Sequence, residues 1–458
     1  MLRLIAAVLL FASAAFAQTA QPDWKQMHDE MLKFTQDLVR IDTSNPPGNE
    51  RRAADYIKGV LDREGIASNI YEKAPGRGNI VARLKGSGKK KPILIMGHLD
   101  VVGVERDKWT VDPFVPLIKD GFLYGRGSAD DKDIVAGVLE TFLTLKRLNV
   151  PLDRDVIFVA EAGEEGTSEF GIDYLIANHW DEIAAEFAYT EGPNPIIVGG
   201  KLQWVGVGTS EKVPRGVKMT ARGTSGHASM PKVDDPITHL AAAIAKIGNW
   251  RTPMRLNDTT RTFFAGLAKI STPEWAQGYT HLEDAKSQER LLAEHSEYYA
   301  MIHTTLVPTI FNGGFRENVI PGSAEAIVDI RALPDENVDA LYVEMKKLIN
   351  DPLVTFAPTG GVLRPANPPS STDTVFYLAL KKAAAEVYGN VPVLPLQAPY
   401  TTDMAQLRKK GVEAYGFGPA ADVERGPRFH GNDERMSIEE MGKYLRWLYT
   451  AVEQTAKQ

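Results

Sequence analysis

The chain has 458 residues, of which 43% are hydrophobic, so it can bury more than one core. Its formal net charge is -7 and it has no basic stripe, which argues against nucleic acid as a partner. It contains no cysteine, which excludes disulfide bonds and thiolate metal ligands.

The first 17 residues have the pattern of a signal peptide. Arg3 is their only charged residue, an apolar stretch follows at 4–16, and Ala15-Phe16-Ala17 is a small-x-small cleavage sequence. The apolar stretch is short for a membrane span, so a retained anchor is the weaker alternative. We therefore expect cleavage after Ala17 and a periplasmic or secreted protein that has no membrane contact once cleaved.

After this segment, helices and strands are predicted to alternate as far as about residue 210. Amphipathic spacing predicts helices at 24–40 and 53–64. Short apolar runs, typical of buried strands, occur at 92–96, 156–160, 187–189 and, much later in the chain, 414–417. The alternation predicts an α/β domain with a mainly parallel sheet covered by helices.

The pattern changes at about residue 213 and predicts a second, α+β domain. Its expected elements are a strand at 216–221, a helix at 236–247, a strand at 324–330, a helix at 338–349 and a strand at 354–356. Residues 259–306 form a long, largely helical insertion within it, and a glycine- and proline-rich return linker begins at residue 358. We therefore predict one domain built from 18–212 and 361–458, interrupted by a second domain at 213–360.

Candidate metal ligands follow the predicted strands. His98 and Asp100 stand two apart at the end of the first strand, and so on one face of extended chain. The other candidates are Glu164 and Glu165 after the second strand, Glu191 after the third, His430 downstream of the fourth, and Asp130 before a helix expected at 133–148. In open α/β sheets ligands bind beyond the carboxyl ends of the strands, so most of these side chains should share one crevice. Nitrogen and oxygen donors without sulfur suit zinc, and their number suits a two-metal hydrolase.

Each candidate alone has an ordinary structural explanation. A single histidine at a strand end is more often a hydrogen-bonded, partly buried side chain than a ligand. Asp130 and the aspartates that follow it favour the start of any helix, and adjacent Glu164 and Glu165 are typical of a solvated loop. The metal site is favoured by the order and spacing of the whole set.

Five stretches of the sequence resemble, in the same order, the motifs of the dinuclear zinc metallopeptidase and amidohydrolase family. That family includes glutamate carboxypeptidase, aminoacylase, acetylornithine deacetylase and succinyl-diaminopimelate desuccinylase. The stretches are residues 96–102, 124–132, 161–166, 189–193 and 429–433. The resemblance runs from about Val39 to about Ser437 and implies a zinc-exopeptidase-like catalytic domain with an inserted α+β lid and dimerisation domain.

The resemblance also implies a role for each ligand in a site with two divalent metal ions per chain. Zinc is the preferred ion, and cobalt or manganese are alternatives. Asp130 would bridge the two ions. His98 and Glu191 would complete one metal site, and Glu165 and His430 would complete the other.

Two further residues have implied roles beside the metals. Asp100 would orient His98 and fix its tautomer. Glu164 would be the general base that takes a proton from the attacking water and returns it to the leaving amine. The family also has a cis peptide bond after its bridging aspartate, here between Asp130 and Asp131.

Three residues of the second domain match the family's substrate-binding pattern. His227, in the stretch 223–231, would reach the active site of a partner subunit and stabilise the oxyanion, which implies a homodimer. Asn318 and Arg331 would bind the substrate carboxylate, a task that suits the planar guanidinium of arginine. Without the resemblance, a loop-capping His227 and an Arg331 paired with Asp329 would be the simpler explanations.

These inferences predict a metal-dependent hydrolase that cleaves an amide or peptide bond next to a free carboxylate. Carboxypeptidase, dipeptidase and N-acyl amino acid hydrolase activities fit best. An acetylornithine deacetylase-like or desuccinylase-like deacylase is an alternative. A non-catalytic, metal-stabilised dimeric binding protein is a second alternative, which the presence of Glu164 disfavours, and the chain lacks the Gly-x-Ser-x-Gly motif of serine hydrolases.

Overall fold

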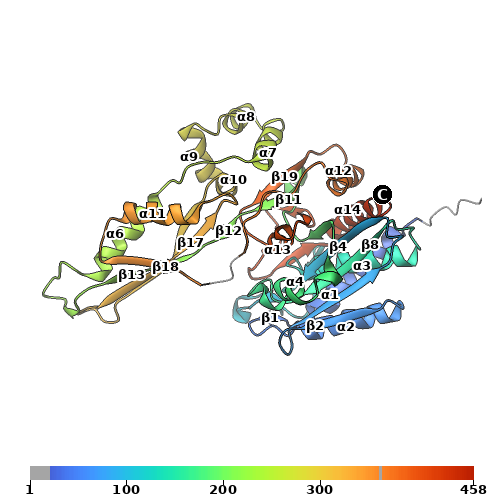
Figure 1. The fold of residues 1–458 in the computed structure, drawn as a ribbon, viewed down its shortest axis with the longest axis horizontal. Coiled ribbons are helices and arrows are strands. Elements are labelled where there is room, and N and C mark those ends of the chain that lie inside the picture. Colours follow the sequence, from blue (N-terminus) through green and yellow to red (C-terminus); the bar gives the residue numbers. More distant parts are fainter. Residues whose placement is uncertain (1–20, 361–363) are drawn as a thin grey trace, which may run out of the picture.

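The structure is a computed structural model that describes residues 21–360 and 364–458. The predicted signal peptide lies outside the described residues. Figure 1 shows a main domain around a large sheet and an elongated lid around a smaller antiparallel sheet. None of the described helices is both long and apolar enough to cross a membrane.

The sheet of the main domain is mixed. Its strands follow the order β2-β3-β8-β4-β9-β20-β11-β10-β21, with β19 beside β11. Their bounds are β2 (Ser68–Glu72), β3 (Gly78–Leu84), β4 (Lys90–His98), β8 (Arg154–Glu161), β9 (Phe187–Thr190), β10 (Ile196–Val198), β11 (Lys201–Glu211), β19 (Val393–Ala398), β20 (Glu413–Gly416) and β21 (Ala421–Asp422). The central strands β8, β4, β9 and β20 are parallel, as predicted, whereas β2, β3 and β11 add antiparallel pairs on either side.

Helices cover both faces of this sheet. One face is covered by α1 (Trp24–Val39), α2 (Glu50–Arg63), α3 (Lys132–Arg147), α12 (Val375–Tyr388) and α14 (Ile438–Ala456). The other is covered by α4 (Ile172–Asn178), α5 (Trp180–Ile183) and α13 (Met404–Lys409). In β4, Ile93 and Ile95 face the first set of helices, while Leu94 and Met96 face the second. Because alternate side chains point to opposite, equally covered faces, a central strand is apolar throughout.

The lid has an antiparallel sheet with one face covered by helices. It contains β12 (Val213–Pro214), β13 (Val217–Arg222), β15 (Thr305–Gly313), β17 (Ser323–Ala332) and β18 (Val354–Pro358), with α6 (Pro236–Asn249) and α11 (Val338–Ile349) packed on it. Asp235 caps the start of α6 through its side chain, and Pro236 suits the first turn. The predicted α+β elements are therefore present, but β15 was not predicted and begins within the segment expected to be helical.

The helical insertion packs on the main domain. It forms α7 (Asp258–Ala268), α8 (Pro273–Thr280), α9 (Ala285–Glu294) and α10 (Ser296–Ile302). Phe263 and Phe264 of α7 share a buried cluster with Trp204 of β11 and with Leu394 and Leu396 of β19. Although this segment interrupts the lid in sequence, its core is continuous with the large sheet.

Short elements complete the described chain. They are β1 (Ser44–Asn45), β5 (Val101–Val102), β6 (Leu117–Lys119), β7 (Phe122–Tyr124), β14 (Gly226–His227), β16 (Val319–Ile320), β22 (Arg435–Ser437) and the 3-10 turns at Arg106–Lys108 and Ser168–Phe170. β14 pairs with β16, which places the segments of His227 and Asn318 side by side on the lid.

Candidate metal centre

The predicted ligands converge at the carboxyl ends of the central parallel strands. His98 is the last residue of β4, and Glu165 and Glu191 follow β8 and β9. Asp130 precedes α3, and His430 lies in the loop between β21 and β22. The sheet thus brings together side chains that are separated by more than 300 residues of sequence.

Asp130 lies between the two histidines. Its Oδ1 is 3.1 Å from His98 Nε2, and its Oδ2 is 3.1 Å from His430 Nε2. A carboxylate whose two oxygens face two separate nitrogen ligands is placed to bridge two cations. The peptide bond between Asp130 and Asp131 is cis, as the resemblance implied.

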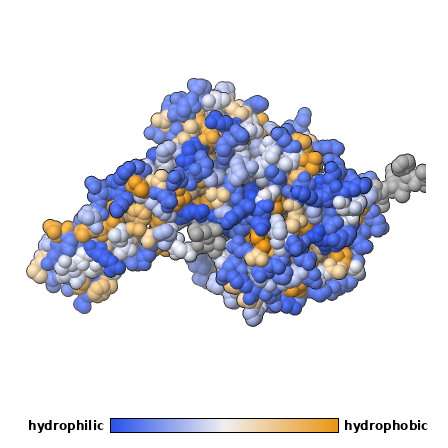
Figure 2. Space-filling model, in the orientation of Figure 1, coloured by the Kyte–Doolittle hydropathy of each residue, from blue (hydrophilic) through white to orange (hydrophobic). Residues whose placement is uncertain are grey.

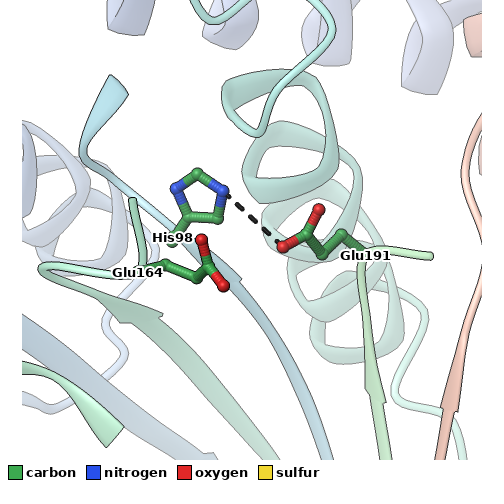
Figure 3. Close-up of side chains that lie close together, drawn as sticks. All are labelled: His98, Glu164 and Glu191. Carbon is green, nitrogen blue, oxygen red and sulfur yellow. Dashed lines mark ion pairs between the residues drawn. The ribbon is translucent and has the colours of Figure 1, made fainter. Parts of the chain in front are cut away.

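Glu191 and Glu165 each make their shortest histidine contact with a different histidine, although donor atoms of His98, Asp130 and Glu165 also lie within 4.8 Å of one another. Glu191 Oε1 is 3.8 Å from His98 Nε2, and both side chains are drawn in Figure 3. On the other side, Glu165 Oε1 is 2.9 Å from His430 Nε2. Glu164 also lies in this cluster, since donor atoms of His98, Glu164 and Glu191 are all within 4.8 Å of one another. Glu164 is therefore close enough to His98 and Glu191 either to bind a metal ion itself or to act as a base on a water molecule beside one.

The cluster concentrates negative charge in a buried place. Burial and the neighbouring carboxylates of Asp130 and Glu164 raise the pKa of Glu191 well above its usual value. Burial raises the pKa of Glu164 to about 8. Hydrogen bonds with Asp130 and Glu165 raise the pKa of His430 to about 10. Buried carboxylates need nearby cations, and donors of nitrogen and oxygen without sulfur fit divalent ions such as zinc.

Asp100 supports more of the site than the sequence suggested. His98 Nδ1 lies 3.0 Å from the backbone oxygen of Asp100 and 3.5 Å from its carboxylate. The carboxylate accepts hydrogen bonds from the backbone N–H groups of residues 163–165, at 3.0, 3.1 and 3.2 Å, and from the Asn45 amide at 2.7 Å. Asp100 therefore fixes the loop that contains Glu164 and Glu165 as well as the orientation of His98.

A buried ion pair that was not predicted joins two ligand loops. Glu434 accepts hydrogen bonds from the backbone N–H groups of Ala129, at 2.9 Å, and Asp130, at 3.2 Å. It also pairs with Arg126, whose guanidinium donates to the backbone oxygen of His430 at 3.2 Å. Arg126 lies within one of the family-like stretches, and Glu434 directly follows another. Neither has an implied role as a metal ligand, so a charged side chain at each of these places was the signal that the sequence offered for a supporting ion pair.

The three lid residues differ in their surroundings. His227 is exposed, and its Nδ1 accepts a hydrogen bond from the backbone N–H of Ser229 at 3.1 Å. Asn318 is also exposed. Arg331 lines the pocket beside the candidate metal ligands and pairs with Asp329 at 2.9 Å. Of the three, Arg331 alone is among the described residues that line this pocket.

The pocket beside the ligands has a volume of about 650 Å³ and a partly apolar wall. Ile196, Trp204 and Leu396 contribute to that wall from β10, β11 and β19. Tyr298 and Met301 contribute to it from α10 of the insertion. The insertion therefore helps to shape the space next to the candidate metal ligands.

We predict that Glu434→Ala weakens zinc binding by about 10- to 100-fold, because loss of a group that holds a metal ligand in place typically has this effect. Competition with a chelator would measure the affinity. Glu440→Ala is the matched control, since Glu440 is also buried but pairs with Lys443 on α14. Equal zinc affinity in both variants would show that the Arg126–Glu434 pair does not support the ligands.

Comparisons with known proteins agree with this geometry. The family model described as "Peptidase family M20/M25/M40" matches residues 94–454. The chain is 29% identical over 382 residues to "Probable carboxypeptidase S-like 2" of Dictyostelium discoideum, covering 80% of this chain and 72% of that protein. It is 28% identical over 445 residues to the human "N-fatty-acyl-amino acid synthase/hydrolase PM20D1", covering 93% and 87%.

A solved structure has the same fold. The M20 family metallo-carboxypeptidase Sso-CP2 from Sulfolobus solfataricus superposes with a TM-score of 0.73 at 21% identity, covering 93% of this chain and 99% of that one. The predicted family and fold are confirmed, and with them the metal-dependent hydrolysis of peptide or amide bonds. The chain belongs to the peptidase family M20/M25/M40.

Proposed function

We propose that the protein is an exported, homodimeric dizinc enzyme that hydrolyses N-acyl amino acids or short peptides with a free carboxylate next to the scissile amide. The observation that best supports two metals is the position of Asp130, with one carboxylate oxygen toward each histidine. The named activities of the carboxypeptidase-like and N-fatty-acyl-amino acid hydrolase relatives support the bond type. Export is inferred from the first 17 residues.

The mechanism assigns separate tasks to the residues around the pocket. Two divalent ions, when bound, would polarise the scissile carbonyl and make hydroxide available near neutral pH. Asp130, His98, Glu191, Glu165 and His430 would hold them. The Glu164 carboxylate would take the proton of the attacking water and deliver it to the leaving nitrogen.

Arg331 is the candidate for binding the substrate carboxylate. It lines the pocket, and a guanidinium can hold a carboxylate with two parallel hydrogen bonds. In the structure its Nε donates to Asp329 at 2.9 Å, which leaves the terminal nitrogens for a ligand. A substrate whose carboxylate is bound by Arg331 would have its neighbouring amide at a fixed distance from the metal ions. Substrates with a free carboxylate next to the scissile bond would therefore be preferred.

The apolar wall favours a large apolar group in the substrate. Ile196, Trp204, Leu396 and Met301 offer aliphatic and aromatic surface, whereas a charged succinyl group would find few partners among them. An N-acyl amino acid with a long chain, or a peptide with a large apolar side chain, fits this wall. The name of the human relative supports the acyl-chain alternative.

We expect kcat/KM for N-acyl amino acids to rise by about fourfold per added methylene until the pocket is full, since burial of each contributes ~0.8 kcal/mol. The test compares acetyl, longer acyl and succinyl derivatives of one amino acid. Ile196→Asp should lower the rate for long chains by at least about tenfold and change the acetyl rate little. Ile197→Asp is the matched control, because the adjacent side chain lines a different cavity. A flat series would argue against the apolar subsite.

We predict that Glu164→Gln keeps the wild-type metal content while kcat falls by about 10²-fold or more, the scale of a lost general base. Metal analysis and steady-state kinetics measure the two quantities. Asp130→Ala is the comparison variant and should lose both metals. Loss of metal in Glu164→Gln would identify Glu164 as a ligand instead.

The dimer is supported by the lid surface. Large apolar side chains are exposed there, and Figure 2 shows apolar patches on the lid face that it draws. These exposed residues are Met230, Val233, Val307, Ile310, Phe311 and Phe315. An exposed apolar surface rimmed by polar groups favours an interface. A second copy would cover it and would bring its exposed His227 to an active site that His227 does not line in its own chain.

We predict that His227→Ala and Glu164→Gln chains complement each other when co-expressed. Each homodimer has two inactive sites, whereas a heterodimer has one site with neither lesion. Random assortment should restore about a quarter of wild-type activity if sites are independent. Differently tagged chains allow the heterodimers to be isolated and assayed. Inactive heterodimers would place His227 at its own chain's site or at none.

A further inference from the structure

A buried arginine contacts Glu164 and has no part in the mechanism above. Arg364 is 5% exposed, and its Nη2 donates to Glu164 Oε1 at 2.9 Å. The same nitrogen lies 3.4 Å from the backbone oxygen of Glu164. Within residues 21–360 and 364–458, no other hydrogen-bond donor reaches the Glu164 carboxylate. One of its oxygens is thus held, and the other is left for proton transfer.

The arginine is itself held from two directions. Its Nη1 pairs with Asp403, at the start of α13, and donates to Gln406 Oε1 at 3.0 Å. Its backbone oxygen accepts hydrogen bonds from both terminal nitrogens of Arg215, each at 3.1 Å. Arg215 lies between β12 and β13, and Arg364 begins the return of the chain to the main domain. Asp403 and Gln406 therefore hold the guanidinium, and Arg215 holds the backbone of the same residue at the junction of the two domains.

A general base in this position needs such a restraint. Glu164 lies among donor atoms of His98 and Glu191, within the distance at which a carboxylate can ligate a metal. A glutamate side chain that rotates freely could turn onto a metal ion and cease to act as a base. A planar guanidinium that is already anchored through one terminal nitrogen, as Arg364 is through Nη1, can hold a carboxylate with the other at little further entropic cost.

We propose that Arg364 is a positioning residue for Glu164, which it holds through one carboxylate oxygen in the orientation for proton transfer. This role rests on the proposed function of Glu164 as the base. Arg364 is not among the described residues that line the pocket, and its contact with the site is through Glu164.

The test is a double-mutant cycle on kcat. Arg364→Ala should keep the wild-type metal content and KM while kcat falls by about 10- to 100-fold, part of the 10²–10⁴-fold that a general base contributes. In the Glu164→Gln background the same change should lower kcat by less than about twofold, because residues that act through one another are not additive. Equal losses in both backgrounds would overturn the proposal.

Arg408→Ala is the matched control for a structural effect. Arg408 is another buried arginine, paired with Glu211 at 2.8 Å, and its hydrogen bonds do not include Glu164. We expect this variant to lose stability with kcat close to wild type. A kcat loss as large as that of Arg364→Ala, in a folded and metal-loaded Arg408→Ala, would assign the effect to general loosening of the domain.

Chemical rescue gives a readout that a purely structural role would not change. Guanidinium ion, at concentrations far below those that unfold proteins, should raise the kcat of Arg364→Ala several-fold, whereas urea should not.

If Arg364→Ala does not fold, Arg364→Lys replaces it as the test variant. Lysine keeps the charge but not the planar fork, so the kcat of this variant should lie clearly below wild type. A wild-type kcat in Arg364→Lys, or no guanidinium rescue of a folded Arg364→Ala, would overturn the proposal.

The cycle also separates this inference from the proposed function. If Glu164→Gln retains wild-type kcat, the general-base role fails, and Arg364 has no base to position. If Glu164→Gln is slow but Arg364→Ala has wild-type kcat, the base role stands and only the positioning role is overturned.

Discussion

The rest of the site depends on one electrostatic constraint, the gathering of several buried carboxylates around Asp130. Like charges in a buried place repel one another and lose hydration, so their assembly costs free energy that the surrounding structure must supply. The supporting contacts are of two kinds. Asp100 and Glu434 accept backbone N–H groups of the ligand loops, and arginines balance charge at the periphery. These contacts cross-link the loops that contain the candidate metal ligands.

Much of the main domain could be predicted from local sequence. Buried parallel strands are apolar on both faces, so β4 and β8 stand out as short apolar runs. The carboxyl ends of such strands gather at one edge, which is why His98 and Glu191 could be placed in the same crevice from their positions alone. The family-like stretches supplied what spacing could not, namely which carboxylate lies between the histidines.

The missed features depend on contacts between distant parts of the chain. Arg364 meets Glu164 across 200 residues, and Arg126 meets Glu434 across 308. Nothing in the local pattern around an arginine indicates its partner at such a separation. The strand β15 was missed for a related reason: many of its apolar residues are exposed, and its extended form is stabilised by pairing with β17.

The place of the helical insertion limits how the lid can move. The backbone passes between lid and main domain near residue 212 and residue 360, and again near residue 255 and residue 303 on its way into and out of α7–α10. A domain attached by adjacent entry and exit segments can swing as a hinge, but each additional connection removes a rotational freedom. Met301 and Tyr298 pack against strands β11 and β19 of the main domain, whereas Arg331 lies on strand β17 of the lid. Any lid motion that remains would change the distance between the apolar wall and Arg331, the proposed binding residue for the substrate carboxylate.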